Sequence, residues 1–321
     1  MRTLTAGEAL TILRGLQDVC ILIHRSPDGD CIGSGYALHL LLKSFGIRSK
    51  VACADTIPAM YAALTDGVEF EEFEPRCFVA VDVADRGLLG TLNEQYPDCE
   101  VKLCIDHHIS NAGYAEQNYW NPDASAACEL MFTLLRDNEI PMTEQIARCL
   151  YVGIATDTGC FKFDNAKADT FAAIAEIKRQ YPNLPYARLN RELFDLKSRG
   201  RLVLDARLME NVQMSADGKV ALIYLPYAWM TELGVTKDET DGLANLPMQI
   251  LGVEVAITVK QQETGEYRVS MRAGDYADVS AICQRFGGGG HVKAGGCSIY
   301  DGEPQEVCKM LMDVASAMLN A

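Results

Sequence analysis

The sequence has few of the features that assign a protein quickly. None of its twelve cysteines belongs to a C-x-x-C pair. Several of them, such as Cys20, Cys104 and Cys149, lie inside apolar runs, where a reduced thiol packs as a small hydrophobic group. The spacing therefore predicts neither a disulfide framework nor a structural zinc site.

Long apolar runs are also lacking. No stretch approaches the ~18 residues that a membrane-spanning helix needs. The first residues, MRTLTAGEALTILRGL, lack the cationic segment, apolar core and cleavage site of a signal peptide. We therefore expect a cytoplasmic protein with no membrane partner.

Positive charge is scarce, because the net charge is −15. Sequence-independent binding of a long nucleic acid needs a cationic groove that displaces counterions. A long nucleic acid is therefore not expected as a partner. A small phosphorylated ligand remains compatible with this charge, since a local pocket decides its binding.

What is present is the pattern of a soluble globular protein with 321 residues, 49% of them apolar, which is enough for about two domains. In the first half, short β-branched runs alternate with helix-length apolar patterns. This alternation predicts an α/β fold with a mainly parallel sheet and helices on both faces. The expected strands are Val19–His24, Lys50–Ala54, Cys77–Asp82 and Val101–Asp106, and the expected helices are Ile32–Phe45, Ser125–Asn138 and Glu144–Thr156.

The pattern changes in the second half. A proline-punctuated stretch is followed by Ala187–Gln213, which has the pattern of one long polar helix. Alternating strands begin near Gly218 and precede a helical DVSAICQRF and a glycine run. We expect a first domain at 1–186, a connector helix at 187–213 and a smaller mixed α/β domain at 214–321.

Polar side chains cluster where the expected strands of the first half end. Because the carboxyl ends of parallel strands meet at one edge of a sheet, and ligands collect there, we expect these side chains to converge. A further acid, Asp157, ends the expected helix Glu144–Thr156 and is followed by a turn that would expose its side chain. The set comprises His24, Asp28, Asp30, Asp82, Asp106, His107, His108 and Asp157.

Carboxylates held close together raise each other's pKa unless a cation balances them. Acids combined with imidazoles and no thiolate suit Mn²⁺, Mg²⁺ or Fe²⁺, and the set exceeds what one ion requires. The sequence therefore predicts two ions that share a bridging carboxylate, an arrangement that serves phosphoryl displacement. Four of the five histidines lie in polar clusters or in the glycine run, whereas His39 has the pattern of an ordinary helix residue and receives no role.

The stretch FGGGGHVKAGG is the second chemical signal. Successive glycines can point several backbone N–H groups at one anion, and His291 could add a hydrogen bond or a positive charge. Arg268 and Arg272 would share one face of a strand and could grip a phosphate. The alternative for the glycine run is a flexible turn, and the alternative for the two arginines is an exposed strand edge. The expected substrate-binding residues are Arg268, Arg272, Gly288, Gly289, Gly290 and His291.

Five motifs carry a resemblance to a known family. HRSPDGD, VAVDVAD, CIDHHIS and GIATDTG resemble, in order, the four motifs of the DHH phosphoesterase family, and FGGGGHVKAGG resembles the signature of its DHHA1 domain. A two-domain chain of this size is most similar to the NrnA-like group of nanoRNases and 3′-phosphoadenosine-5′-phosphate phosphatases.

The resemblance implies an active site with two Mn²⁺ ions in the cleft between the two domains. It implies that His24, Asp28 and Asp82 hold one ion, and that Asp30, Asp82, His107 and Asp157 hold the other. Asp106 would orient a neighbouring histidine, and His108 would act near the scissile phosphate.

The implied activity is hydrolysis of short oligoribonucleotides, linear dinucleotides or 3′-phosphoadenosine-5′-phosphate by a metal-bridging hydroxide. Cyclic dinucleotide phosphodiesterases, pyrophosphatases and single-strand DNA exonucleases are alternatives within the family, and a non-catalytic nucleotide sensor is an alternative of another class. A homodimer, the preferred substrate and the cleavage direction stay open. Two departures concern the pocket: Ala273 follows Arg272 where the family usually has serine, and Ala126 and Ala127 stand where relatives often carry Ser-Thr.

Overall fold

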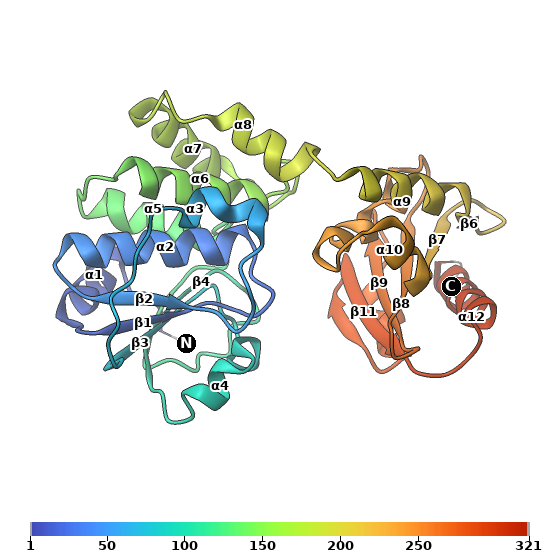
Figure 1. The fold of residues 1–321 in the computed structure, drawn as a ribbon, viewed down its shortest axis with the longest axis horizontal. Helices are drawn as coiled ribbons and strands as arrows, with labels where there is room; N and C mark the ends of the chain where they lie inside the picture. The colour runs from blue at the N-terminus through green and yellow to red at the C-terminus, as the bar shows by residue number, and fades with distance from the viewer. Residues whose placement is uncertain (1, 320–321) are drawn as a thin grey trace. The chain divides into compact units, whose positions relative to one another are not determined.

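The computed structural model describes residues 2–319. The chain forms two compact units, Met1–Leu196 and Lys197–Ala321, and each is described here by itself. Figure 1 shows a parallel-sheet unit in blue and green, and a smaller unit in yellow to red.

A five-stranded parallel sheet, in the order β2-β1-β3-β4-β5, organises the first unit. Its central strands are continuous apolar runs, as expected of strands that are covered on both faces. The strands are β1 (Val19–Leu22), β2 (Ser49–Ala52), β3 (Cys77–Val81), β4 (Val101–Asp106) and β5 (Gln117–Trp120).

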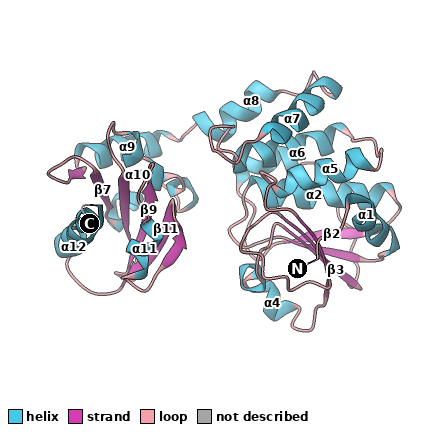
Figure 2. Ribbon diagram, turned by 180° about the vertical axis from the view of Figure 1, so that it is seen from behind, coloured by secondary structure: helices cyan, strands magenta, loops and turns pink. Residues whose placement is uncertain are grey.

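Helices cover both faces of this sheet unequally, which confirms the predicted fold class. Most of them pack on one face around the larger hydrophobic core, while η2 (Arg86–Leu89) and α4 (Leu92–Gln95) cover the other (Figure 2). The remaining helices of the unit are α1 (Ala6–Gly15), α2 (Gly29–Ser44), η1 (Ala59–Tyr61), α3 (Ala62–Thr65), α5 (Ala127–Asp137), α6 (Glu144–Asp157), α7 (Ala168–Gln180), α8 (Tyr186–Asn190) and the π-helical η3 (Arg191–Asp195).

The four predicted strands and three predicted helices of this half are all present, with ends that differ by up to a few residues. The edge strand β5 was not expected. It is only four residues long and contains Gln117 and Asn118, so neither its length nor its composition marks a strand.

Glycines allow α2 and α6 to pack closely. A Cβ at Gly33 would lie 2.5 Å from the carbonyl oxygen of Cys149, and a Cβ at Gly29 would lie 2.4 Å from Oγ1 of Thr156. Any side chain at these positions would force the helices apart. The close packing brings the start of α2 beside the end of α6.

The second unit is built on a six-stranded mixed sheet in the order β10-β11-β9-β8-β7-β6, in which β7 and β8 pair in parallel and the other neighbouring strands pair antiparallel. Residues of α12 and α11 pack on one face, and residues of α9 and α10 pack over β7 on the other. The elements are α9 (Arg199–Glu210), β6 (Gln213–Met214), β7 (Val220–Leu225), α10 (Tyr227–Leu233), η4 (Asp238–Thr240), η5 (Leu243–Asn245), η6 (Pro247–Gln249), β8 (Val255–Gln261), β9 (Tyr267–Ala273), α11 (Val279–Gln284), β10 (Gly289–His291), β11 (Ala294–Ile299) and α12 (Pro304–Leu319).

The segment expected as one connector helix, 187–213, is interrupted. After η3 the backbone is extended at Leu196, and a new helix begins where the Ser198 side chain accepts a hydrogen bond from the backbone N–H of Arg201 at 3.0 Å. Ser198 therefore caps the N-terminus of α9. The run of Arg and Leu residues concealed this second helix start.

The glycine run does not form the flexible turn considered as an alternative, because Gly289 and Gly290 belong to one strand of the β10–β11 hairpin. A Cβ at Gly288 would lie 2.1 Å from the carbonyl oxygen of Gly296, and a Cβ at Gly290 would lie 2.4 Å from that of Ala294. The close approach of the two strands explains these glycines without a ligand.

Within residues 2–319, no helix combines the length and the apolar character needed to cross a membrane.

Substitution tests the close packing of α2 and α6. We expect Gly33→Ala to lower the free energy of unfolding by ~1–3 kcal/mol, because the added methyl group overpacks the interface. Urea unfolding measures the change. Gly15→Ala is the matched control, because Gly15 is also helical and a Cβ there has no neighbour within 4 Å. Equal stability of the two variants would contradict the packing argument.

Candidate metal centre

The predicted metal ligands converge at the carboxyl edge of the first sheet. His24 and Asp82 follow β1 and β3, and His107 follows β4. Asp28 and Asp30 lie at the start of α2, and Asp157 is the last residue of α6. Three ligand groups, each with atoms within 4.8 Å of one another, result: His24, Asp28, Cys31 and Asp82; Asp82, His107 and His108; Asp30, His107 and Asp157.

Asp82 belongs to the first two of these groups, and its two oxygens face different histidines. Its Oδ2 lies 3.5 Å from Nε2 of His24, and its Oδ1 lies 3.4 Å from Nε2 of His107. The residue is buried and has φ +59°, a conformation that few side chains adopt without strain. The carboxylate is therefore held where it can bridge two ions.

His24 and Asp28 complete one side of the centre. His24 Nδ1 lies 2.8 Å from the carbonyl oxygen of Arg25, so this nitrogen carries the proton and leaves Nε2 as a ligand. Asp28 Oδ1 caps α2 by accepting the backbone N–H groups of Asp30 and Cys31 at 3.0 Å. The same oxygen lies 3.7 Å from His24 Nε2.

His107 organises the other side in the same way. Its Nδ1 lies 3.3 Å from the carbonyl oxygen of Ala124, and its Nε2 faces Asp157 Oδ2 at 3.6 Å and Asp30 Oδ2 at 3.8 Å. These separations are too long for hydrogen bonds but suit two ligands on either side of one ion. Both histidines thus present Nε2 to carboxylates while Nδ1 is oriented by the main chain.

Two orphaned atoms test whether a cation fits. Asp82 Oδ1 and His107 Nε2 are buried, and neither has a hydrogen-bond partner among the described residues. Burial of an unpaired carboxylate oxygen is costly. A divalent cation between them would satisfy both atoms, so the donor set fits a metal site.

Electrostatics of the metal-free cluster leads to the same conclusion. Burial, reinforced by Asp82, raises the pKa of Asp30 well above its usual range, and burial together with neighbouring acids raises the pKa of Asp157 to about 7. Burial opposes protonation of His107, but the Asp82 carboxylate and other acids raise its pKa to about 10. Without a metal, protons on the imidazole of His107 and on the carboxyls of Asp30 and Asp157 therefore reduce the repulsion.

Asp30 has a second task, because its carboxylate caps helix α5. Its oxygens accept the backbone N–H groups of Ala127 at 2.6 Å and Cys128 at 2.9 Å. The N-cap residue Ala126 supplies no side-chain cap. Because the alanines in this stretch have no side-chain group that could cap α5, the carboxylate of Asp30, a predicted metal ligand, caps this helix instead.

Asp106 and His108 lie directly beside the ligands. Asp106 is buried, and its Oδ1 accepts a hydrogen bond from Nδ1 of His108 at 2.8 Å. His108 Nδ1 also lies 3.4 Å from Asp82 Oδ1. Asn111 donates a hydrogen bond to the other Asp106 oxygen, and Trp120 Nε1 donates one to the carbonyl oxygen of His108 at 2.8 Å.

Sequence reasoning did not single out Cys31, Asn111 or Trp120. Cys31 belongs to a ligand group, but its Sγ contacts the carbonyl oxygen of Asp28 at 3.6 Å, as a core thiol does. Asn111 directly follows the motif CIDHHIS and could have been noticed as a polar residue after the histidines. No sequence signal indicated Trp120, which belongs to the unexpected strand β5.

The expected substrate-binding residues all lie in the second unit. Arg268 and Arg272 share one face of β9, because Tyr267, Val269 and Met271 are buried on the other. The register pairs Ala294 with both Arg272 and His291, which puts His291 on the same face as the arginines. His291 and Arg268 are exposed, and Gly289 and Arg272 are partly buried.

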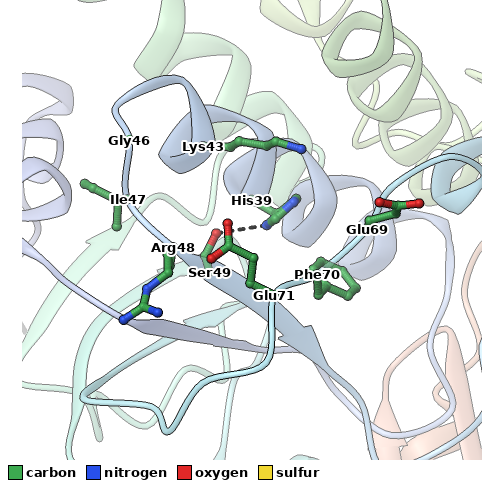
Figure 3. A pocket seen from close by; sticks show the side chains of 9 residues that line it. All are labelled: His39, Lys43, Gly46, Ile47, Arg48, Ser49, Glu69, Phe70 and Glu71. Carbon is green, nitrogen blue, oxygen red and sulfur yellow. Dashed lines mark hydrogen bonds between the residues drawn. The ribbon is translucent and has the colours of Figure 1, made fainter.

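His39, to which no role was assigned, lies away from the ligands near the other end of α2. Its ring is buried, and its Nδ1 hydrogen-bonds Ser49 Oγ at 2.9 Å beside a cavity of about 310 Å³ (Figure 3). The ring meets Phe70 edge-on, with the ring centroids 4.8 Å apart. None of the predicted metal ligands lines this cavity.

An acid–imidazole cage at the carboxyl edge of a parallel sheet defines a protein suited to holding divalent cations. Comparison with known families is more specific. Residues 18–154 match the DHH family, N-terminal domain, and residues 217–320 match the DHHA1 domain. The chain therefore belongs to the DHH/DHHA1 phosphoesterase family, as an NrnA-like member.

Individual relatives cover nearly the whole chain. It is 28% identical over 286 residues to a probable bifunctional oligoribonuclease and PAP phosphatase NrnA of Streptococcus mutans, covering 87% of this chain and 89% of that protein. It is 25% identical over 301 residues to the bifunctional oligoribonuclease and PAP phosphatase NrnA of Bacillus subtilis, covering 92% of this chain and 93% of that protein. An exopolyphosphatase-related protein from Bacteroides fragilis shares the fold, with a TM-score of 0.89, 20% identity and coverage of 98% and 97%.

Metal uptake should release protons. Neighbouring acids raise the pKa of His107 to about 10, and burial raises the pKa of Asp157 to about 7, so both groups favour the protonated form when no metal is bound. A cation must displace these protons, so we expect its affinity to fall as the pH falls. Calorimetry of Mn²⁺ binding in buffers of different ionisation enthalpy measures the release. Proton-free binding with a pH-independent affinity would show that these groups are not the ligands.

Proposed function

We propose that this protein is a phosphoesterase that hydrolyses very short nucleotides: oligoribonucleotides of a few residues, linear dinucleotides and 3′-phosphoadenosine-5′-phosphate. The observation that carries the proposal is the buried Asp82 carboxylate, whose two oxygens face separate groups of ligands. Such paired sites serve in-line displacement at phosphorus. The relatives named as oligoribonucleases and PAP phosphatases support the substrate class.

Two divalent cations are the proposed cofactors, and Mn²⁺ is the preferred one. His24, Asp28 and Asp82 would hold one ion, and Asp30, Asp82, His107 and Asp157 the other. A donor set of carboxylates and imidazoles suits Mn²⁺, with Mg²⁺ and Fe²⁺ as alternatives. When bound, the ions supply positive charge for the phosphate oxygens and lower the pKa of water.

The protein's own residues divide the remaining work. His108, held at Nδ1 by Asp106, has Nε2 available for a proton transfer at the leaving group. The exposed His291 and the face of β9 with Arg268 and Arg272 would bind the rest of the substrate. An overall charge of −15 favours short ligands, because attraction of a long strand grows with the number of phosphates neutralised.

The bridging role is tested by Asp82→Asn, which keeps the shape and removes the charge. We expect hydrolysis of a labelled diribonucleotide with Mn²⁺ to fall by about a thousand-fold or more, since several kcal/mol of charge stabilisation are lost. The matched control is Asp123→Asn at an exposed position paired with Lys167. Retained turnover in Asp82→Asn would refute the two-ion proposal, and no turnover by the unaltered protein would refute the enzyme assignment in favour of a nucleotide sensor.

The binding role of the second unit is tested by His291→Ala. We expect a higher KM for the diribonucleotide with a smaller change in kcat, because the residue contacts substrate away from the reacting bond. Hydrolysis of the small ester bis-p-nitrophenyl phosphate should stay the same, and Lys309→Ala on α12 serves as the control. An equal loss of kcat on both substrates would assign His291 to the chemistry instead.

A further inference from the structure

The loop that follows β4 holds Asp106 from two sides. Its Oδ1 accepts the ring Nδ1–H of His108 at 2.8 Å and lies 3.3 Å from the backbone nitrogen of His108. Its Oδ2 accepts a hydrogen bond from the side-chain amide of Asn111. Both oxygens of a fully buried carboxylate are therefore engaged, and the carboxylate cannot rotate without losing a bond.

The orientation of the Asn111 amide is fixed by a contact of its oxygen. Its Oδ1 accepts the backbone N–H of Gly113 at 2.8 Å, which requires an oxygen at that position. The amide nitrogen must then face Asp106. The main chain of the loop is held as well, because the carbonyl oxygen of His108 accepts Asn111 N at 3.1 Å and Trp120 Nε1 at 2.8 Å.

The position of Asp106 matters because a second carboxylate, that of Asp82, also lies near the ring of His108. Nδ1 of His108 lies 2.8 Å from Asp106 Oδ1 but only 3.4 Å from Asp82 Oδ1, the orphaned oxygen of the bridging carboxylate. A small rotation of Asp106 would let His108 turn to Asp82. That hydrogen bond would occupy the oxygen that a cation needs and would move Nε2 of His108.

We propose that Asn111 is a positioning residue that locks Asp106 toward His108 and thereby keeps His108 from capturing the Asp82 oxygen. This inference rests on the proposed hydrolytic function, because it assigns His108 and Asp82 their separate tasks. Asn111 itself touches neither the substrate nor an ion. It acts through Asp106 on the direction of one ring.

Two substitutions separate this role from a purely structural one. Asn111→Ala removes both of these contacts, together with the one from Nδ2 of Asn111 to Sγ of Cys104 at 3.7 Å. Asn111→Asp keeps an oxygen for the Gly113 N–H but cannot donate to Asp106 at alkaline pH, where the new carboxylate is ionised. We expect both variants to lower kcat for the diribonucleotide by ~10–100-fold, the usual size of effect when a group that orients the residues of a metal site is lost, with KM little changed.

The matched control is Asn138→Ala, which removes an asparagine amide bonded to a backbone carbonyl at the end of α5, away from the site. It should retain kcat. Wild-type kcat in Asn111→Asp with a loss in Asn111→Ala would show that only the Gly113 contact matters and would overturn the proposal. Wild-type kcat in both variants would overturn it too.

A readout without turnover uses the metal-free protein. In the ¹H–¹⁵N spectrum of the histidine side chains, His108 should show an Nδ1-bound proton whose shift changes in both Asn111 variants but not in Asn138→Ala. An unchanged signal overturns the positioning role. If the unaltered protein does not hydrolyse the diribonucleotide, the proposed function fails, while this spectrum still decides whether Asn111 directs His108. Thermal melting shows that each variant is folded.

Discussion

The structure depends on the confinement of four carboxylates, those of Asp28, Asp30, Asp82 and Asp157, around two imidazoles. These carboxylates repel one another because they lie close together, and burial removes the water that would screen their charges. Metal-free protein balances them with protons, as the raised pKa values of Asp157 and His107 show. The fold must therefore supply enough stability elsewhere to hold a cluster that becomes fully satisfied only when cations bind.

That stability comes from elements that end at the cluster. The strands deliver Asp82 and His107 from a core of fully buried side chains, and α2 and α6 pack against each other through glycines. Asp30 links the helices to the strands, since its carboxylate caps α5 and also faces His107 at the end of β4. Loss of its charge would affect both the helix start and the ligand group, so stability and function are not separable at this residue.

The sequence predicted the parts of the site that depend on chain topology. Parallel strands end at one edge, so His24, Asp82 and His107 had to meet once β1, β3 and β4 were recognised. It could not show that Asp30 caps α5, because that contact joins positions about a hundred residues apart with no local signal. The interrupted connector and the β10–β11 hairpin were missed for a similar reason: the Ser198 cap and the pairing of Gly290 with Gly295 depend on geometry that helical and glycine patterns do not reveal.

The adjacent histidines show why residues around a metal site need as much control as the ligands. His107 and His108 have ring centroids 4.6 Å apart and share one nearby oxygen of Asp82. Two imidazoles cannot both use that oxygen while it also binds an ion. The carbonyl oxygen of Ala124 orients Nδ1 of His107, whereas the carboxylate of Asp106 orients Nδ1 of His108. Different partners on equivalent nitrogens thus give neighbouring residues of the same type different chemistry.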